Sequence, residues 1–421
     1  MPFLNELKWR GLLHQTAGDG IEAHLATPGR VAYAGFDPTS TSLTIGNYIP
    51  IKMLAHWQRA GHRPIVLMGG GTGLIGDPSG KTAERQLLSR EQVQANVEAQ
   101  QRVFERVLDF SGSWAAHIVD NADWLCRLGF VEVLRDVGKH FSVNQMIHRE
   151  SVASRLENRE QGISFTEFSY MILQAYDFVH LHRESNCTVQ LGGSDQFGNI
   201  VSGIDLIRRM CGAESWGVTA PLVTRADGGK IGKTEQGAVW LTAEHTSPFA
   251  FHQYWLNTTD ADVVRYLRWF TFLSRERIEE LEAAHGAAPH ERSAQRALAD
   301  HMTELLHGST ELSRVQAAAA ALFGGDVREL DDRTLREVFA EAPHSAGSRH
   351  ELDGEGLDLV ELLASTTLCT SKREAREFLG NGSIQLNGER VAAGRRVTAA
   401  DLLHGRLVLL RRGKKHWHAV E

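Results

Sequence analysis

The feature that most constrains the fold is a strand, helix and strand pattern near the start of the chain. RVAYAGFD (residues 30–37) is a short apolar run typical of a buried strand, and NYIPIKMLAHWQRAG (47–61) has the periodicity of an amphipathic helix. RPIVLMGGG (63–71) then predicts a second strand that enters a glycine-rich loop. At this spacing the three segments predict a βαβ unit, in which both strands belong to one parallel sheet.

The same kind of pattern returns further along the chain. FSYMILQAYDFVHLHRE (168–184) is helical, NCTVQLGGSDQFGN (186–199) is a strand that runs into another glycine loop, and IVSGIDLIRRM (200–210) is again helical. We therefore predict an α/β fold with a Rossmann-like parallel-sheet domain over residues 1–222. In such sheets, ligands bind at the carboxyl ends of the strands.

The pattern changes after residue 222. Residues 223–325 predict a lysine-containing loop followed by an α-helical domain, because segments such as DVVRYLRWFTFL (262–273) carry only the helical periodicity. The acidic residues 326–355 have the polarity of a linker. Residues 356–421 give two short helical patterns and a hairpin through Asn387-Gly388, which predicts a small α+β domain.

The composition excludes several classes of protein. With 42% hydrophobic and 23% charged residues, the chain has no apolar run near the roughly 18 residues of a membrane span. Its start lacks the apolar segment of a secretory signal, so we expect a cytoplasmic protein without a membrane partner. The four cysteines are scattered without a CxxC pair, so the sequence indicates neither a disulfide framework nor a zinc site.

Positive charge is concentrated at the carboxyl end. Residues 370–421 contain 11 Lys and Arg against 5 Asp and Glu, although the whole chain carries −7. A basic segment on an acidic body favours a polyanionic partner, and the alternative interpretation is an ordinary solvated surface.

The glycine-rich run GGGTGLIGDPSGKT (69–82) matches two nucleotide motifs only in part. A dinucleotide-binding GxGxxG should open a helix, but here Asp77-Pro78 follows at once. A P-loop needs four residues between its first glycine and Gly-Lys-Thr, and only three separate Gly76 from Gly80. The remaining interpretation is a loop kept free of side chains so that a ligand lies against backbone, with Asp77 available to pair with an ammonium group.

Two further segments carry chemistry. RADGGKIGKTEQG (225–237) places Lys230 and Lys233 in a glycine-rich loop suited to closing on phosphates, although a solvated polar turn has the same composition. YAGFDPTSTSLTIGN (33–47) brings small hydroxyl residues and Gly46 to the start of a helix, where a phosphate group is favoured.

Taken together, these segments resemble the bacterial tyrosyl-tRNA synthetases, which are class I aminoacyl-tRNA synthetases. TIGN (44–47) lies where that class carries its HIGH signature, and KIGKT (230–234) lies where it carries KMSKS. YAGFDPT, GLIGDPSGK, SYMILQAYDF and LGGSDQFGN are similar to the tyrosine enzymes more specifically. The resemblance covers essentially the whole chain, and its last segment is similar to an S4 RNA-binding domain.

The resemblance implies a reaction and a set of site residues. ATP, with Mg²⁺ and no organic cofactor, would activate L-tyrosine to tyrosyl-adenylate, which then reacts with tRNA(Tyr). The tyrosine-binding set is Tyr33, Asp77, Tyr170, Gln174, Asp177 and Gln190. The ATP and adenylate set is Gly35, Asp37, Gly46, Gly193, Asp195, Gln196 and Lys233. The catalytic set is Thr39, Thr44, Asn47, Lys230, Lys233 and Thr234.

Some of these assignments have support or alternatives of their own. Tyr170, Gln174 and Asp177 are spaced i, i+4 and i+7, which predicts a shared helix face. Lys81 and Arg85 are assigned to the pyrophosphate or the tRNA, or else form an ordinary surface i, i+4 pair.

The sequence departs from the family where Thr44 and Asn47 replace both signature histidines. That departure keeps a decayed synthetase acting as an RNA-binding protein open as an alternative, beside a tryptophanyl-type enzyme. A homodimer is expected from the resemblance alone.

Overall fold

The computed structural model describes residues 2–77, 87–149, 152, 153, 156, 163–229, 231–234, 237–323, 326–340, 342–413 and 416–421. It divides into two units, Met1–Thr246 with Trp255–Leu306, and Ser247–Tyr254 with His307–Glu421. Among the described residues, no helix combines the length and the apolar character that a membrane crossing requires.

The first unit is built on a six-stranded sheet with the order β1-β6-β5-β2-β3-β4. All neighbouring strands pair in parallel except β1, which pairs antiparallel with β6 at one edge. The predicted parallel sheet is thus confirmed, with an antiparallel edge strand that the sequence pattern did not reveal. The strands are β1 Gln15–Ala17, β2 Val31–Phe36, β3 Arg63–Met68, β4 His117–Asp120, β5 Cys187–Gly193 and β6 Trp216–Ala220.

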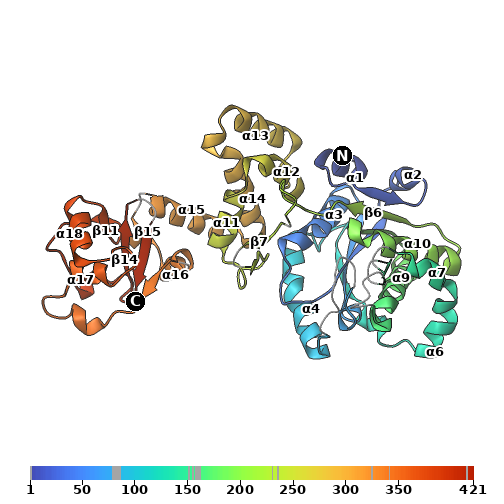
Figure 1. Cartoon of the computed structure of the whole chain (residues 1–421). Coiled ribbons are helices and arrows are strands. Elements are labelled where there is room, and N and C mark those ends of the chain that lie inside the picture. The colour runs from blue at the N-terminus through green and yellow to red at the C-terminus, as the bar shows by residue number, and fades with distance from the viewer. Residues whose placement is uncertain are drawn as a thin grey trace. The chain divides into compact units, whose positions relative to one another are not determined.

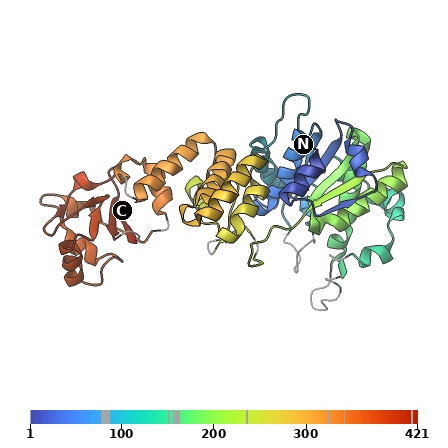
Figure 2. The ribbon, with the colours of Figure 1, turned by 90° about the horizontal axis from the view of Figure 1, so that it is seen from above.

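Helices cover both faces of this sheet (Figure 1), as Figure 2 shows from above. Because alternate strand residues point to opposite faces, Tyr33, Ile65 and Cys187 share a buried cluster with Phe178 and Leu206 on one side. On the other side, Phe36 meets the ring of Phe104 at 4.8 Å. The helices are α1 Phe3–Arg10, α2 Ile21–Leu25, α3 Tyr48–Arg59, α4 Arg90–Glu105, α5 Ala122–Leu125, α6 Phe130–Glu132, α7 Val143–Ile147, α9 Phe165–Ser185 and α10 Phe197–Cys211.

The caps of the long helices follow from local sequence. Ser164 precedes α9 and accepts the Glu167 N–H at 3.2 Å, which satisfies one of the unpaired donors at a helix start. Asn186 ends α9 and Gly212 ends α10, both with positive φ, 51° and 64°. These left-handed residues turn the chain at the end of each helix.

The short paired strands β7 Lys233–Thr234 and β8 Gly237–Ala238 follow β6, and the region from Pro248 is helical, as its periodicity predicted. Its helices are α11 Pro248–Leu256, α12 Asp260–Phe270, α13 Arg275–Ala287, α14 Ser293–His307 and α15 Ser309–Phe323. The helices α12, α13 and α14 belong to the first unit, whereas α15 belongs to the second.

The second unit ends in a five-stranded sheet with the order β12-β11-β14-β15-β9. The predicted hairpin is confirmed, because Asn387 and Gly388 both adopt positive φ, 48° and 87°, between β11 and β12. Strand β9 pairs in parallel with β15. The elements are α16 Asp332–Phe339, β9 His344–Ser345, β10 Leu357–Asp358, α17 Leu359–Ala364, α18 Lys372–Gly380, β11 Ile384–Leu386, β12 Glu389–Arg390, β13 Arg396–Val397, β14 Val408–Arg412 and β15 His416–Val420.

Candidate active site

Polar side chains gather where β2, β3, β4 and β5 end, the edge at which an open parallel sheet binds ligands. The sheet register places Tyr33 of β2 opposite Gln190 of β5 and Ile65 of β3. Short 3₁₀ turns follow at this edge, at Ile45–Asn47, Thr72–Leu74 and Ser194–Gln196.

A buried carboxylate and a buried phenol form one end of the site. Asp177 of α9 is 1% exposed and accepts the side-chain N–H groups of Asn121 at 2.9 Å and Trp124 at 2.8 Å. Burial raises the pKa of Asp177 to about 8, although the bonds from Asn121 and Trp124 oppose that shift. Burial, and then the charge of Asp177, also raise the pKa of Tyr33.

Two polar atoms at this end lack a partner among the described residues. The Tyr33 hydroxyl is buried without a hydrogen bond, and so is Oε1 of its strand neighbour Gln190. Buried polar atoms in native proteins are nearly always paired, and leaving one unpaired costs about 1–3 kcal/mol. Unpaired atoms beside Asp177 therefore indicate that a polar ligand group completes this end of the site.

A second network continues from Asn121 toward α9. Asn121 donates to Thr72 Oγ1 at 3.0 Å, and Thr72 in turn donates to Asp37 Oδ1 at 2.9 Å. Tyr170 donates to the other oxygen, Asp37 Oδ2, at 3.0 Å. Burial, followed by the charge of Asp37, raises the pKa of the Tyr170 hydroxyl. The hydroxyl therefore stays a donor.

Glycines let the loop after β3 approach these carboxylates. A Cβ at Gly69 would lie 2.4 Å from Asp37 Oδ1, and one at Gly70 would lie 2.2 Å from Asp120 Oδ1. Gly70 instead donates its backbone N–H to Asp120 at 2.9 Å. The loop is therefore free of side chains for a reason internal to the fold, namely contact with two carboxylates.

A third group of amides and carboxylates lies beyond β5. Gln196 donates to Asp77 Oδ2 at 2.7 Å, and Gln174 donates to Gln196 Oε1 at 3.2 Å. Asn199 donates to Gln174 Oε1 at 2.9 Å. Burial raises the pKa of the neighbouring Asp195 carboxyl, although a hydrogen bond from Gln196 lowers it. Asp77, Gln174 and Gln196, assigned separately from sequence, thus form one connected group.

Thr44 and Asn47, which occupy the places of the signature histidines, bond to each other. The backbone N–H and the hydroxyl of Thr44 both donate to Asn47 Oδ1, at 3.0 and 2.8 Å. They form a capping box at the turn before α3. Since the cap uses the carbonyl oxygen of Asn47, the N–H groups of this side chain are the ones that remain to donate. Gly46 between them is exposed.

The backbone of the lysine loop lies against this signature. Val239 donates its N–H to Gly232 O at 2.8 Å, and Ile45 donates to Val239 O at 3.1 Å. A Cβ at Gly232, whose φ is +74°, would lie 3.3 Å from Cβ of Ile45. The two signatures, far apart in sequence, are therefore neighbours through described backbone.

Several of the predicted site residues take no part in the polar contacts described above. Gly35 and Thr39 are exposed at the end of β2 and in the turn after it, and Gly193 ends β5. Lys233 and Thr234 pair with Ala238 and Gly237 through their backbone, and their side chains lie outside the described residues. Lys230, Lys81 and Arg85 also lie outside them.

Sequence reasoning missed Asn121, Trp124, Thr72 and Asn199, which hold the carboxylates and amides in place. A signal for the first two was present, because NADW (121–124) follows directly on the strand β4, where ligands bind in such sheets. Thr72 lies inside the glycine loop, and Asn199 is the last residue of LGGSDQFGN, one of the segments that carry the resemblance.

Comparison with known proteins gives a consistent result over the whole length. The family model for class I tRNA synthetases (W and Y) matches residues 28–324, and one for a Tyrosine--tRNA ligase SYY-like C-terminal domain matches residues 335–420. The chain is 49% identical over 419 residues to the Tyrosine--tRNA ligase of Roseiflexus castenholzii. This alignment covers 99% of this chain and 98% of the relative. With that of Bacillus caldotenax it is 49% identical over 424 residues, or 100% and 99% of the two chains.

Solved structures agree with this. A C-terminally truncated Aspergillus nidulans mitochondrial tyrosyl-tRNA synthetase superposes with a TM-score of 0.69 at 30% identity, covering 76% of this chain and 94% of that one. Plasmodium falciparum tryptophanyl-tRNA synthetase reaches a TM-score of 0.52 at 14% identity, with 79% and 87% covered, which is a likeness of fold alone.

Proposed function

Since this chain belongs to the tyrosyl-tRNA synthetases and is a tyrosine--tRNA ligase that uses tyrosine, ATP and tRNA, we propose how its residues share that reaction. The observation that carries the proposal is the Tyr33 hydroxyl beside Asp177, which has no partner in the part of the chain that the structure describes. Neither the tryptophanyl-type alternative nor that of a decayed RNA-binding protein is favoured, because relatives that are 48–49% identical over 98–99% of their length are Tyrosine--tRNA ligases.

The phenol of the substrate lies between Tyr33 and Asp177. Its hydroxyl is both donor and acceptor, so it bonds to a carboxyl oxygen of Asp177 and accepts from Tyr33. Asn121 and Trp124 hold that carboxylate in one orientation, as their bonds of 2.9 and 2.8 Å indicate. Gln190 completes the wall with its buried, unpaired Oε1.

The ammonium group of tyrosine is held at the other end of the pocket. Asp77 supplies the opposite charge, and Tyr170 and Gln174 supply oxygens from one face of α9. The adenylate ribose and phosphate then meet Asp37, Asp195, Gln196 and the glycines of the strand ends. A Cβ at Gly35 would meet no atom within 4 Å, so the glycine there leaves room for a ligand.

Phosphate chemistry takes place over the start of α3. Thr39, Thr44 and Asn47 supply hydroxyl and amide donors at a helix start. Lys230, Lys233 and Thr234 act on the departing pyrophosphate, and Lys81 and Arg85 act there or on tRNA. Mg²⁺ enters with ATP as part of the substrate, bound to phosphate oxygens.

Both steps are transfers that need positioning and charge stabilisation from the protein. In the first, the tyrosine carboxylate attacks the α-phosphorus of ATP, and the bond to pyrophosphate breaks. In the second, a hydroxyl of the terminal ribose of tRNA attacks the carbonyl carbon of the adenylate, and AMP leaves. The nucleophile belongs to a substrate in each step, so no covalent enzyme intermediate is required.

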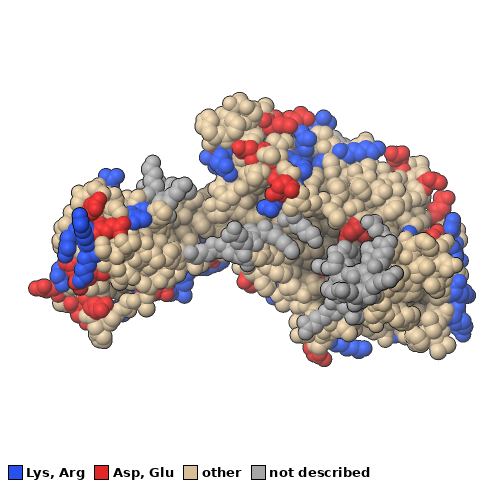
Figure 3. All heavy atoms as spheres, in the orientation of Figure 1, with Lys and Arg blue, Asp and Glu red and all other residues tan. Residues whose placement is uncertain are grey.

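The carboxyl-terminal residues 356–421 act as an RNA-binding domain. Arg373, Arg376 and Arg390 are exposed and form no ion pair within the described part of the chain. Figure 3 shows lysine and arginine side chains along one edge of this domain, among several carboxylates. Such charges favour the phosphates of a folded RNA.

A chain that ends at residue 324, where the synthetase family model ends, should separate the two steps. We expect ATP-pyrophosphate exchange close to that of the full chain, since every residue assigned to the adenylation site lies before residue 235. Charging of tRNA should fall about 100-fold or more, because several phosphate contacts are lost. Equal losses in both assays would show that the removed part serves stability instead.

A second copy of this chain covers an exposed apolar surface on the first unit. Phe130, Val131, Val143 and Phe165 are 69%, 73%, 61% and 69% exposed, an unusual set for large apolar side chains. Val143 and Phe165 lie on α7 and at the start of α9, which pack together through Met146 and Met171, and Phe130 and Val131 lie on α6. An isologous dimer would bury this surface.

Phe130→Glu should therefore convert a dimer into a monomer in analytical ultracentrifugation. The matched control is Phe110→Glu, since Phe110 is 37% exposed and lies outside the patch. A wild-type chain that sediments as a monomer would contradict the proposed dimer.

We place the protein in the cytoplasm, where tRNA and ATP are available. Recovery in a membrane or secreted fraction would contradict this placement.

A further inference from the structure

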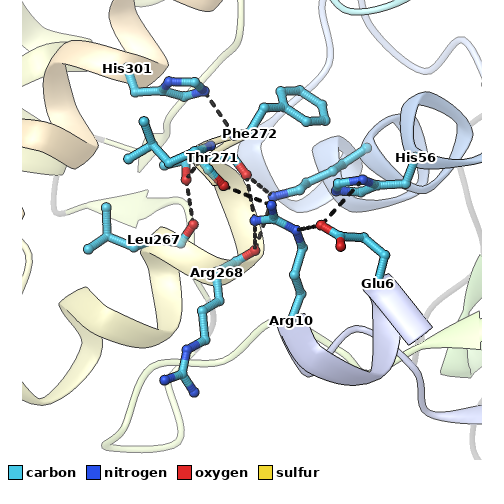
Figure 4. Close-up of polar contacts among 10 residues, drawn as sticks. Glu6, Arg10, His56, Leu267, Arg268, Thr271, Phe272 and His301 are labelled. Atoms are coloured by element: carbon cyan, nitrogen blue, oxygen red, sulfur yellow. Dashed lines mark hydrogen bonds and ion pairs between the residues drawn. The ribbon is translucent and has the colours of Figure 1, made fainter. Parts of the chain in front are cut away.

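Helix α12 is fixed at its carboxyl end by two cations from other helices (Figure 4). The last carbonyl groups of a helix have no intrahelical partner and attract positive charge. Arg10 of α1 donates to Arg268 O at 3.1 Å, to Thr271 O at 3.0 Å and to Leu273 O at 2.9 Å. Lys52 of α3 donates to Arg268 O at 3.1 Å and also to Thr271 O. We call these two residues the carbonyl clamp.

The clamp joins α12 firmly to the helix that carries the signature. Lys52 is 0% exposed, and burial lowers its pKa well below the usual value. A buried ammonium group is costly unless its hydrogen bonds are made, so the spacing of α3 and α12 is tightly set. Tyr48, the first residue of α3, adds a bond to Phe270 O at 3.1 Å. Helix α3 begins directly after Asn47 of the signature.

The lysine loop has two stems, residues 224–226 before Lys230 and residues 237–239 after Lys233. The amino end of α12 holds the first stem. Asp262 is 3% exposed, and its Oδ1 accepts the backbone N–H of Ala226 at 2.9 Å. Arg265 pairs with Asp262 and donates to Thr224 O at 3.0 Å. The Arg265 guanidinium also lies 4.8 Å from the ring centre of Trp269, which restricts its position.

These contacts therefore connect the lysine loop, α12, α3 and the signature (44–47) in a closed circuit. One stem of the loop is bonded to α12 through Ala226, and the other is bonded to the signature through Val239 and Ile45. Helix α12 is bonded in turn to α3 by the clamp. At 1.5 Å per residue its 11 residues span about 16 Å, so the helix acts as a rigid spacer between signature and stem.

We propose that Asp262 and Arg265 are positioning residues for tyrosine activation, which set the stem of the lysine loop at a fixed place relative to the signature. The inference rests on the proposed role of Lys233. Neither residue touches substrate, and each acts through the backbone at Thr224 and Ala226. Misplacing a group that stabilises the departing pyrophosphate lowers the rate without weakening the binding of tyrosine.

Asp262→Ala tests this against Asp260→Ala. Asp260 lies two residues earlier at the same helix end but accepts from Gln295 of α14 at 2.7 Å, so it does not contact the stem. We expect Asp262→Ala to lower kcat in ATP-pyrophosphate exchange about 10- to 100-fold, the usual cost of a small misplacement. The Kd for tyrosine should stay within about twofold, as expected for an effect confined to the transition state. Asp260→Ala should leave both near wild type.

Two further measurements separate positioning from folding. Arg265→Met keeps the unbranched stem beside Trp269 but removes the bond to Thr224, so it should reproduce the loss in kcat even if Asp262→Ala does not fold. In a background of Lys233→Ala, either variant should cause little additional loss, since both act through the same loop.

Equal exchange rates for the Asp262 and Asp260 variants, with Lys233→Ala impaired, would overturn this inference alone. Full additivity with Lys233→Ala would also overturn it. A normal rate for Lys233→Ala would instead overturn the proposed role of the loop, on which the inference depends.

Discussion

Phenylalanine should be activated about 10⁵-fold less efficiently than tyrosine, a selectivity for which tyrosyl-tRNA synthetases themselves are the standard example. The physical reason lies in three buried groups, since Asp177, Tyr33 and Gln190 are 1%, 0% and 3% exposed. Tyrosine supplies a hydroxyl to this end of the pocket. Phenylalanine supplies none and leaves the polar atoms dehydrated and unpaired. The measurement is kcat/KM for each amino acid in ATP-pyrophosphate exchange.

Asp177→Ala should remove much of that selectivity. We expect kcat/KM for tyrosine to fall about 10- to 100-fold, as when a buried hydroxyl loses its hydrogen-bond partner, with little change for phenylalanine. Glu184→Ala is a matched control, because Glu184 is an exposed carboxylate two turns further along α9. Comparable values for the two amino acids in the wild-type enzyme would exclude a phenol-specific pocket.

Lys233→Ala should lower kcat for tyrosine activation about 10²- to 10³-fold, the range found when one preorganised donor to a developing charge is removed. The Kd for tyrosine should be unchanged, because pyrophosphate charge develops only as the bond to phosphorus breaks. The measurement is single-turnover adenylate formation beside equilibrium binding of tyrosine. Lys8→Ala, which removes an exposed lysine from α1, is the control. A normal rate in Lys233→Ala would remove the loop from the chemistry.

Periodicity and spacing were sufficient for the elements that carry the site. The alternation of apolar residues predicted β2, α3 and β3, and the i, i+4, i+7 spacing predicted one face for Tyr170, Gln174 and Asp177. All three side chains contact site residues, namely Asp37, Gln196 and Asn121. Such patterns are readable because each residue's direction is fixed by its own helix or strand.

The partners of those residues were not predictable in the same way. Asn121 reaches Asp177 across 56 residues of sequence, and Lys52 reaches Thr271 across 219. Neither distance is encoded in local periodicity. In the sequence, Lys52 is one lysine among apolar residues of α3. Its role is recognisable only in the structure, where carbonyl groups of α12 lie beside it. The antiparallel edge strand β1 was missed for a similar reason, since three residues are too few for a pattern.

The carbonyl clamp has a consequence for how this family can diverge. Arg10 and Lys52 bind backbone oxygens of residues 268–273, and not their side chains. Substitutions at those positions therefore leave the acceptors in place, because every amino acid carries the same carbonyl group. Replacement of Lys52 by an apolar residue removes the donor and leaves Thr271 O with less than its full set of bonds. Retention of this contact in related sequences therefore depends on the side chains of Arg10 and Lys52, whereas the amino acids at 268–273 can change.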